Sequence, residues 1–198
     1  MRPSARPPTP AAERPGRAAL DAGALRLLAT GGFQATSFSN VLKLTGAPRG
    51  SIYHHFPGGK DELVIAALDL AEANAAAALT AVGGTTPTDV ADAFLEMWRQ
   101  LLVQTDCGAG CSVLGVTVSA NSPDVLERAA EIFREWRASL AQRLADAGLE
   151  PPAAEPFAVL LIAGAEGAVV LSRAEKSIDP FDTVAAELRA HLAALQAS

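Results

Sequence analysis

The sequence predicts an all-α protein, and three observations support this fold class. Alanine recurs along the whole chain and runs of β-branched residues are few, which favours helices because alanine loses least on entering one. Apolar residues recur at intervals of three and four in most segments, and Gly and Pro punctuate the ends of those segments. The 198 residues suit one or two domains with a substantial core.

The first half of the chain contains four predicted helices, each with a local start or stop signal. The hydroxyl of Ser37 can accept from a free backbone N–H and so cap the second helix, which Gly46 ends in a tight turn. Pro48 is tolerated in the first turn of the third helix. The helices are expected at residues 13–33, 36–46, 47–56 and 60–82.

The second half is expected to be helical throughout, with a loop at residues 105–111. Ser122 and Pro123 begin the clearest amphipathic helix of the chain, and Gly148 follows its end. Residues 112–120 have the composition of a strand, but the helical context favours a helix. The helices are expected at residues 88–104, 112–120, 121–148, 155–175 and 180–197.

Charge is unevenly distributed along the chain. Residues 1–60 hold eight Lys and Arg against two acids, whereas the remainder holds eight against twenty, giving −6 for the whole chain. Such a split suggests that the front of the chain meets a polyanion, although charge also fluctuates along chains without a function. Residues 1–13 read as a disordered basic arm without an apolar signal segment, and no apolar run reaches the length of a membrane span. We therefore expect a cytoplasmic protein that does not contact a membrane.

The second and third predicted helices and the glycine turn between them form a candidate helix-turn-helix. A helix that enters a DNA major groove shows polar groups outward and hides apolar groups behind. Ala47, Ile52 and Phe56 are expected to face inward, and Arg49 could donate two hydrogen bonds to a guanine. The expected outward residues are Pro48, Arg49, Gly50, Ser51, Tyr53 and His54.

Phosphate contacts are expected around this helix. Tyr53, His55 and Lys60 can reach a DNA backbone, and Ser37 and Ser39 can do so beside free backbone N–H groups. The alternative is an ordinary helical hairpin with solvated polar residues.

The run "GGFQATSFSNVLKLTGAPRGSIYHHFPGGKDEL" resembles the DNA-binding domain of TetR-type transcriptional regulators. The resemblance implies a three-helix reader, a linking fourth helix, and a larger helical domain that dimerises and holds an inducer. It also implies that Tyr53, His55 and Lys60 contact phosphates and that Arg49 and Ser51 read bases. The segment "CGAGCSVLGVTVSANSPDVLERAAEIFREWRASLAQRL" is similar to the LmrA/YxaF-like subgroup.

Two departures from the family pattern concern the phosphate contacts. The segment "FPGGK" holds one residue more before Lys60 than the commonest spacing, and Phe38 stands where many relatives have a Thr. The predicted domains are the arm at 1–13, a helix-turn-helix DNA-binding domain at 14–74, and a ligand-binding and dimerisation domain at 75–198.

An inducer cavity is expected between the helices of the larger domain, because ligand sites in helical bundles lie there and Met and Trp adapt to ligands. Each of its candidate residues could instead be plain core. The candidate wall residues are Phe94, Met97, Trp98, Leu101, Cys111, Leu114, Val118, Phe133, Trp136, Phe157 and Leu161.

Cys107 and Cys111 are the only cysteines, and they are too few for a zinc site without a nearby His. A redox-sensing pair remains open, since Cys111 could lie at a helix N-terminus that favours a thiolate. Glu166 stands in an apolar segment and needs a partner, which could be Arg173, the ligand or the dimer seam.

A dimer interface is predicted where small residues recur in the penultimate helix and leucines in the last. Packing within one chain is the alternative. The candidate interface residues are Gly164, Gly167, Ala168, Leu171, Ser172, Val184, Leu188 and Leu192.

These observations together predict a homodimeric repressor on a near-palindromic double-stranded operator, released by a small-molecule inducer. No enzyme activity, metal or cofactor is expected. The rival interpretations are a thiol-based regulator or enzyme using Cys107 and Cys111, and a ligand-binding dimer without DNA function.

Overall fold

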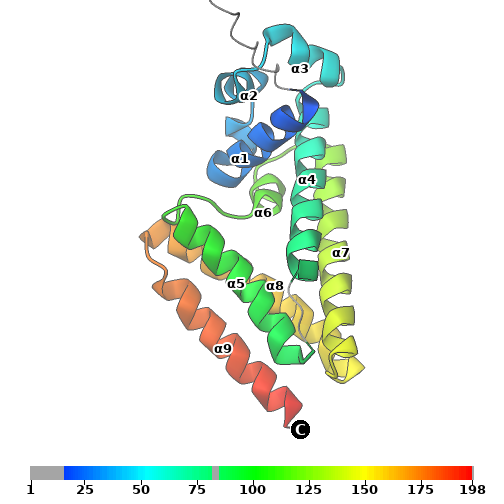
Figure 1. Cartoon of the computed structure of the whole chain (residues 1–198), viewed down its shortest axis with the longest axis vertical. Helices are drawn as coiled ribbons and strands as arrows, with labels where there is room; N and C mark the ends of the chain where they lie inside the picture. The colour runs from blue at the N-terminus through cyan, green and yellow to red at the C-terminus, as the bar shows by residue number, and fades with distance from the viewer. Residues whose placement is uncertain (1–15, 82–84, 198) are drawn as a thin grey trace, which may run out of the picture.

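The computed structural model describes residues 16–81 and 85–197, and these form nine helices and no strand (Figure 1). The all-α prediction is confirmed, and the predicted arm at 1–13 lies outside the described residues. The helices are α1 (Arg17–Ala35), α2 (Phe38–Thr45), α3 (Arg49–His55), α4 (Lys60–Ala81), α5 (Pro87–Gln104), α6 (Ser112–Thr117), α7 (Pro123–Asp146), α8 (Pro151–Glu175) and α9 (Asp179–Gln196).

Local signals position the ends of the early helices. Gly32 has φ +71° and interrupts α1 one residue before the predicted end of the first helix, residue 33. The Ser37 hydroxyl accepts from the Asn40 backbone N–H at 3.2 Å, and Gly46 ends α2 with φ +70°. This left-handed conformation favours glycine because a Cβ would be strained there. The helix-turn-helix geometry therefore follows from residues that act locally.

Helices α1, α2 and α3 pack around a small apolar core at one end of the molecule (Figure 1). Leu20, Val41 and Ile52 come from the three different helices and are fully buried. Gly23 of α1 lies where α2 crosses, since a Cβ there would come within 2.5 Å of the Thr45 side chain. The buried Ile52 anchors α3 to this core, with the rest of α3 on the outside of the domain.

The larger domain consists mainly of α5, α7, α8 and α9, with the lower part of α4 against it (Figure 1). Helix α8 packs on both α7 and α9, and its fully buried residues Phe157 and Leu161 lie in the core. The segment at 112–120, ambiguous in the sequence, forms helix α6 and then a turn.

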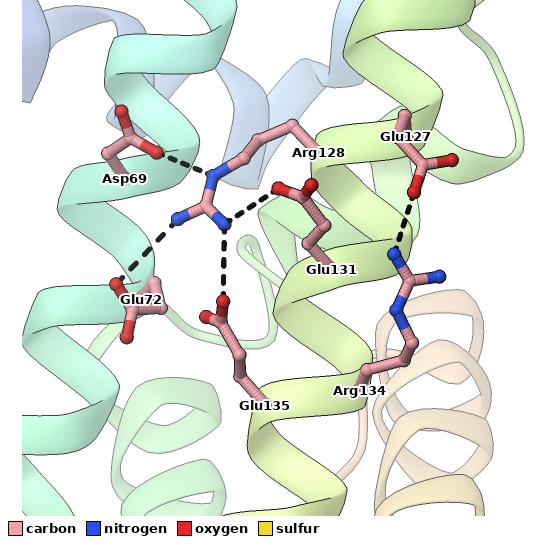
Figure 2. Close-up of polar contacts among 7 residues, drawn as sticks. All are labelled: Asp69, Glu72, Glu127, Arg128, Glu131, Arg134 and Glu135. Carbon is pink, nitrogen blue, oxygen red and sulfur yellow. Dashed lines mark hydrogen bonds and ion pairs between the residues drawn. The ribbon is translucent and has the colours of Figure 1, made fainter.

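Arg128 of α7 pairs with carboxylates of α4 (Figure 2). The Arg128 guanidinium of α7 lies 2.7 Å from Asp69 and 3.8 Å from Glu72, both on α4. Glu131 and Glu135 of its own helix approach it at 3.2 and 3.6 Å. Helix α4 is therefore fixed to the larger domain at its middle, while its start belongs to the three-helix domain.

Helix α6 and the loop before it connect the two domains a second time. The Gly110 backbone N–H donates to the carbonyl of Ala29 at 2.9 Å, and Arg173 of α8 donates to the carbonyl of Thr30 at 3.0 Å. Both acceptors lie near the end of α1. The end of α1 is therefore hydrogen-bonded both to the loop before α6 and to α8.

Two helices, α4 and α8, are long and apolar enough to cross a membrane by length and composition, which the sequence analysis did not anticipate. Half of the apolar window of α8 is buried inside the protein. Helix α4 carries Asp69 and Glu72, which pair with Arg128. Packing in the helical body accounts for the buried half of the α8 window.

Candidate nucleic-acid interface and ligand cavity

Helix α3 presents a polar outer face over a buried inner one. Ile52 and Phe56 are buried in the domain core, and Ala47 before the helix is buried as well. The predicted inner side is confirmed. Outward, Pro48, Arg49, Gly50, Tyr53 and His54 are exposed, while Ser51 and His55 are half-buried.

A hollow lies between α2 and α3 and joins residues of both helices. Tyr53 is 60% exposed, and its ring packs edge-on against Phe38 with 5.3 Å between centroids. Phe38 thus positions the tyrosine. The hollow is lined by Phe38, Ser39, Leu42, Lys43, Ala47, Arg49 and Tyr53.

Lys43 was missed as a candidate by the sequence analysis. It is exposed on α2 and lines the same hollow as Arg49. Its spacing of four from Ser39 places both residues on one helix face, which is the signal that could have identified it. Arg49 and Lys43 together make this face cationic, while Ser37 is occupied as the helix cap.

The Lys60 side chain is half-buried and lies over an aromatic ring. Its ammonium lies 3.8 Å from the centroid of the Phe33 ring, a cation–π contact at the start of α4. Burial lowers the pKa of Lys60, and Asp61 partly opposes this shift. A phosphate contact would require its side chain to leave the ring. The carbonyl of His55 accepts from Arg17 at 3.3 Å, which fixes the end of α3 to α1.

A cavity of about 800 Å³ lies among α1, α4, α5, α7 and the start of α6. Ala71, Ala75 and Ala78 of α4 face it, and these small side chains leave the space open. Six of the predicted wall residues line the cavity: Phe94, Met97, Trp98, Leu101, Cys111 and Trp136.

The other five predicted wall residues lie elsewhere. Val118 follows α6 and is 74% exposed, so its prediction as a wall residue is wrong. Phe157 and Leu161 are fully buried on α8, and Phe133 packs edge-on against Trp136 rather than facing the space. Leu114 is half-buried outside the lining.

Polar residues along one edge of α5 also line the cavity and were missed. Helical spacing aligns them, so a helical projection of α5 could have found this edge, but not what it faces. They are Asp89, Asp92, Glu96, Gln100 and Gln104.

Glu166 is the most unusual buried group. It is 7% exposed, and neither carboxylate oxygen has a well-aligned hydrogen-bond partner among the described residues. Burial raises the pKa of Glu166 to about 7, and the nearby Cys111 thiol opposes this shift. Arg173, one of its three predicted partners, is instead bonded to the carbonyls of Thr30 and Gly108.

The cysteines do not have the properties of reactive thiols. Cys111 caps α6 and accepts from the Leu114 backbone N–H at 3.3 Å, but burial and the neighbouring Glu166 raise the pKa of its thiol well above its ordinary value. The expected thiolate at this helix start is therefore disfavoured. Cys107 is buried as well, and both are free thiols.

Gly164, Ala168 and Ser172 of α8 pack within one chain, which was the alternative to the predicted interface at these positions. A Cβ on Gly164 would come within 3.1 Å of Leu188, and the Ser172 hydroxyl accepts from the Phe181 backbone N–H at 3.2 Å. Buried inside the chain are Ala168, Ser172, Leu188 and Leu192, while Val184 is half-buried.

The outer side of α8 is apolar and open. Gly167 and Leu171, two of the predicted interface residues, lie on it. The exposed α8 stripe, as we name this surface, consists of Pro156, Val159, Leu160, Ala163, Gly167, Val170, Leu171 and Ala174.

Comparison with known proteins identifies the family. Residues 20–67 match the model for bacterial regulatory proteins of the tetR family, and residues 87–187 match the model for the C-terminal domain of LmrA/YxaF-like transcriptional regulators. An HTH-type transcriptional regulator of Mycobacterium tuberculosis is 38% identical over 165 residues, which cover 80% of this chain and 84% of the relative.

The chain belongs to the TetR family of transcriptional regulators. The HTH-type transcriptional regulator LmrA of Bacillus subtilis is 30% identical over 166 residues, covering 79% of this chain and 86% of LmrA. A regulatory protein TetR from Rhodobacter sphaeroides has the same fold, with a TM-score of 0.79 and 22% identity over 89% of this chain and 98% of that one. The predicted resemblance, including the LmrA/YxaF-like C-terminal part, is confirmed.

Proposed function

We propose that this TetR-family regulator is a homodimeric repressor that leaves a near-palindromic operator when a small molecule enters its cavity. The observation that supports this best is the cationic outer face of α2 and α3, where Arg49, Lys43 and Tyr53 meet at one hollow over a buried base. A helix supported in this way fits a major groove. The protein acts where the DNA is, in the cytoplasm.

Specific roles follow from the positions of the side chains. Arg49 at the start of α3 would read a guanine through two hydrogen bonds, with Ser51 beside it and Gly50 allowing close approach. The phosphate contacts would come from Ser39, Lys43, Tyr53, His54 and His55. Ser37 would place the N-terminus of α2 beside a phosphate. Lys60 would contact a phosphate once its side chain moves off the Phe33 ring.

Dimerisation through the exposed α8 stripe would pair two readers. Val159, Leu160, Val170 and Leu171 are each between 39% and 49% exposed, and association would remove this apolar surface from water. Two identical stripes related by a two-fold axis would place two α3 helices on inverted half-sites.

Inducer release would use the connections between the domains. A ligand in the cavity touches Ala29 of α1 and Gly110 before α6, which are joined by a backbone hydrogen bond. A ligand that prefers one arrangement of α1 and α4 would shift the population away from the DNA-binding spacing.

The proposal is tested by operator binding of matched variants, measured by fluorescence anisotropy across a salt titration. Arg49→Ala should lower affinity for the operator about 5- to 150-fold and relax base preference at one position. Lys43→Ala and Lys60→Ala should weaken binding on all sequences and reduce the salt slope by about one.

Arg137→Ala removes one exposed charge from α7, outside the reader, and serves as the control. If the reader variants bind like the parent and like Arg137→Ala at every salt concentration, these contacts are wrongly assigned. No specific observation favours the thiol-based alternatives.

A further inference from the structure

We propose that the cavity takes a lipophilic organic cation, whose apolar body contacts Trp98 and Trp136 and whose charge lies at the carboxylate edge of α5. This inference rests on the proposed inducer function and names the chemical class of the ligand. Size, charge and unpaired donors support it separately.

The cavity suits an organic molecule with a large apolar body. Its volume of about 800 Å³ falls within the ordinary range of small-molecule sites. Alanines of α4 form one wall, and Met97, Leu101 and Leu140 contribute to the others. A ligand with aromatic rings would gain the burial that these walls provide.

The charge of the lining is of one sign. Asp89, Asp92 and Glu96 line the cavity, and none of the described residues that line it is Lys, Arg or His. Hydrogen bonds from Thr86 and Thr85 lower the pKa of Asp89 below its ordinary value. An anionic ligand would be repelled by these carboxylates, two of which (Asp89 and Glu96) are exposed, with no cation in the described lining to offset the repulsion.

Two of these carboxylates have no ion-pair partner among the described residues. Asp92 forms an ion pair with Arg189 of α9, whereas no ion pair of Glu96 occurs among the described residues. Among the described residues, Glu96 accepts a side-chain hydrogen bond only from the Gln100 amide, at 3.2 Å. Its neighbour Arg99 is engaged by Asp182 through contacts of 2.8 and 3.2 Å. Glu96 is therefore the carboxylate best placed to receive a cation.

The two tryptophans add a second, independent indication. Trp98 is 6% exposed, and the indole Nε1–H groups of Trp98 and Trp136 have no acceptor within the described structure. An ether or carbonyl oxygen on the ligand could satisfy one of them after a small side-chain adjustment. Indole faces also attract organic cations.

A pair of ions with matched shape and opposite charge tests the proposal: tetraphenylphosphonium and tetraphenylborate. Binding to the full chain is measured without DNA by equilibrium dialysis and by tryptophan fluorescence. The two tryptophans of the chain both line the cavity, so their fluorescence reports on this site. We expect the cation to bind at least about tenfold more tightly than the anion.

Substitution of the carboxylate locates the charge effect. Glu96→Gln should lower the affinity for tetraphenylphosphonium about 3- to 10-fold and narrow its preference over the anion. Glu187→Gln, on the exposed side of α9, is the matched control and should change neither value. Equal or tighter binding of the anion, failure of both ions to bind, or an unchanged preference in Glu96→Gln would overturn the proposal.

The proposed repressor function can fail separately. If tetraphenylphosphonium binds with the expected preference but operator binding is unchanged, the ligand class stands and inducer release is refuted. If a different compound releases the operator while the cation does not bind, the function stands and this ligand class is wrong.

Discussion

Removing the charge of Glu166 should abolish a pH-dependent loss of stability. Burial raises the pKa of this carboxyl from 4.5 to about 7. Between pH 4.5 and about 7, the Glu166 carboxyl is therefore mostly protonated in the folded protein and mostly ionised in the unfolded chain. The stabilisation that comes from this tighter proton binding is fully present below pH 4.5. It declines as the pH rises through 7 and is lost above that.

The size of this loss follows from the pKa change. A rise from 4.5 to about 7 corresponds to about 3 kcal/mol, because each tenfold change in proton affinity is worth about 1.4 kcal/mol. For a chain of this length, that is about 6 to 12 °C in melting temperature. Glu166→Gln should show none of this decline, because its side chain stays neutral at every pH.

Urea unfolding followed by circular dichroism at pH 5, 6, 7 and 8 measures the difference, with protein concentration held constant because dimerisation affects stability. Glu155→Gln, an exposed glutamate of the same helix, is the control and should follow the parent. Parallel pH curves for Glu166→Gln and the parent would show that Glu166 is solvated or paired, and would refute the reasoning.

Three further predictions concern the fold and the assembly. Arg128→Met leaves four carboxylates without their cation and should lower the free energy of urea unfolding by about 1–3 kcal/mol. This loss should be smaller at 500 mM than at 50 mM NaCl, because salt screens the carboxylates. An equal loss at both salt concentrations would contradict the ion-pair explanation. Gly46→Ala should cost about 1 kcal/mol in thermal unfolding because of its φ of +70°, whereas Gly50→Ala, with open space around it, should not destabilise the protein; equal melting temperatures for the two would argue against this. Leu171→Glu should yield monomers in sedimentation velocity and weaken operator binding, and a dimer at micromolar concentration would place the interface elsewhere.

Elements with local signals could be predicted from the sequence. Ser37, Gly46 and Pro48 act on their own backbone, so the boundaries of α2 and α3 followed from residue type. The start of α8 did not, because Pro156 lies inside the helix and suggested a later beginning; the helix starts at Pro151. Pro151 and Pro152 stand in the first turn of this helix, where proline is tolerated.

Faces and cavities required the tertiary structure. The small residues of α8 have the spacing of a close helix contact, but whether α9 of the same chain or a second subunit fills that contact depends on where α9 lies. The cavity exists because alanines of α4 stand opposite α5, a pairing of distant segments that periodicity does not reveal. The sequence could assign Trp98 to the interior. It could not show that the indole N–H of Trp98 lacks a hydrogen-bond acceptor there.

The most direct test of the central claim, that paired α3 helices read DNA, is selection of bound duplexes from a random pool, followed by sequencing. We expect enrichment of two inverted half-sites whose centres lie one helical turn or a whole multiple apart, and loss of one preferred base pair per half-site with Arg49→Ala. A pool that stays random at low salt, or that yields a single unpaired half-site, would contradict the account.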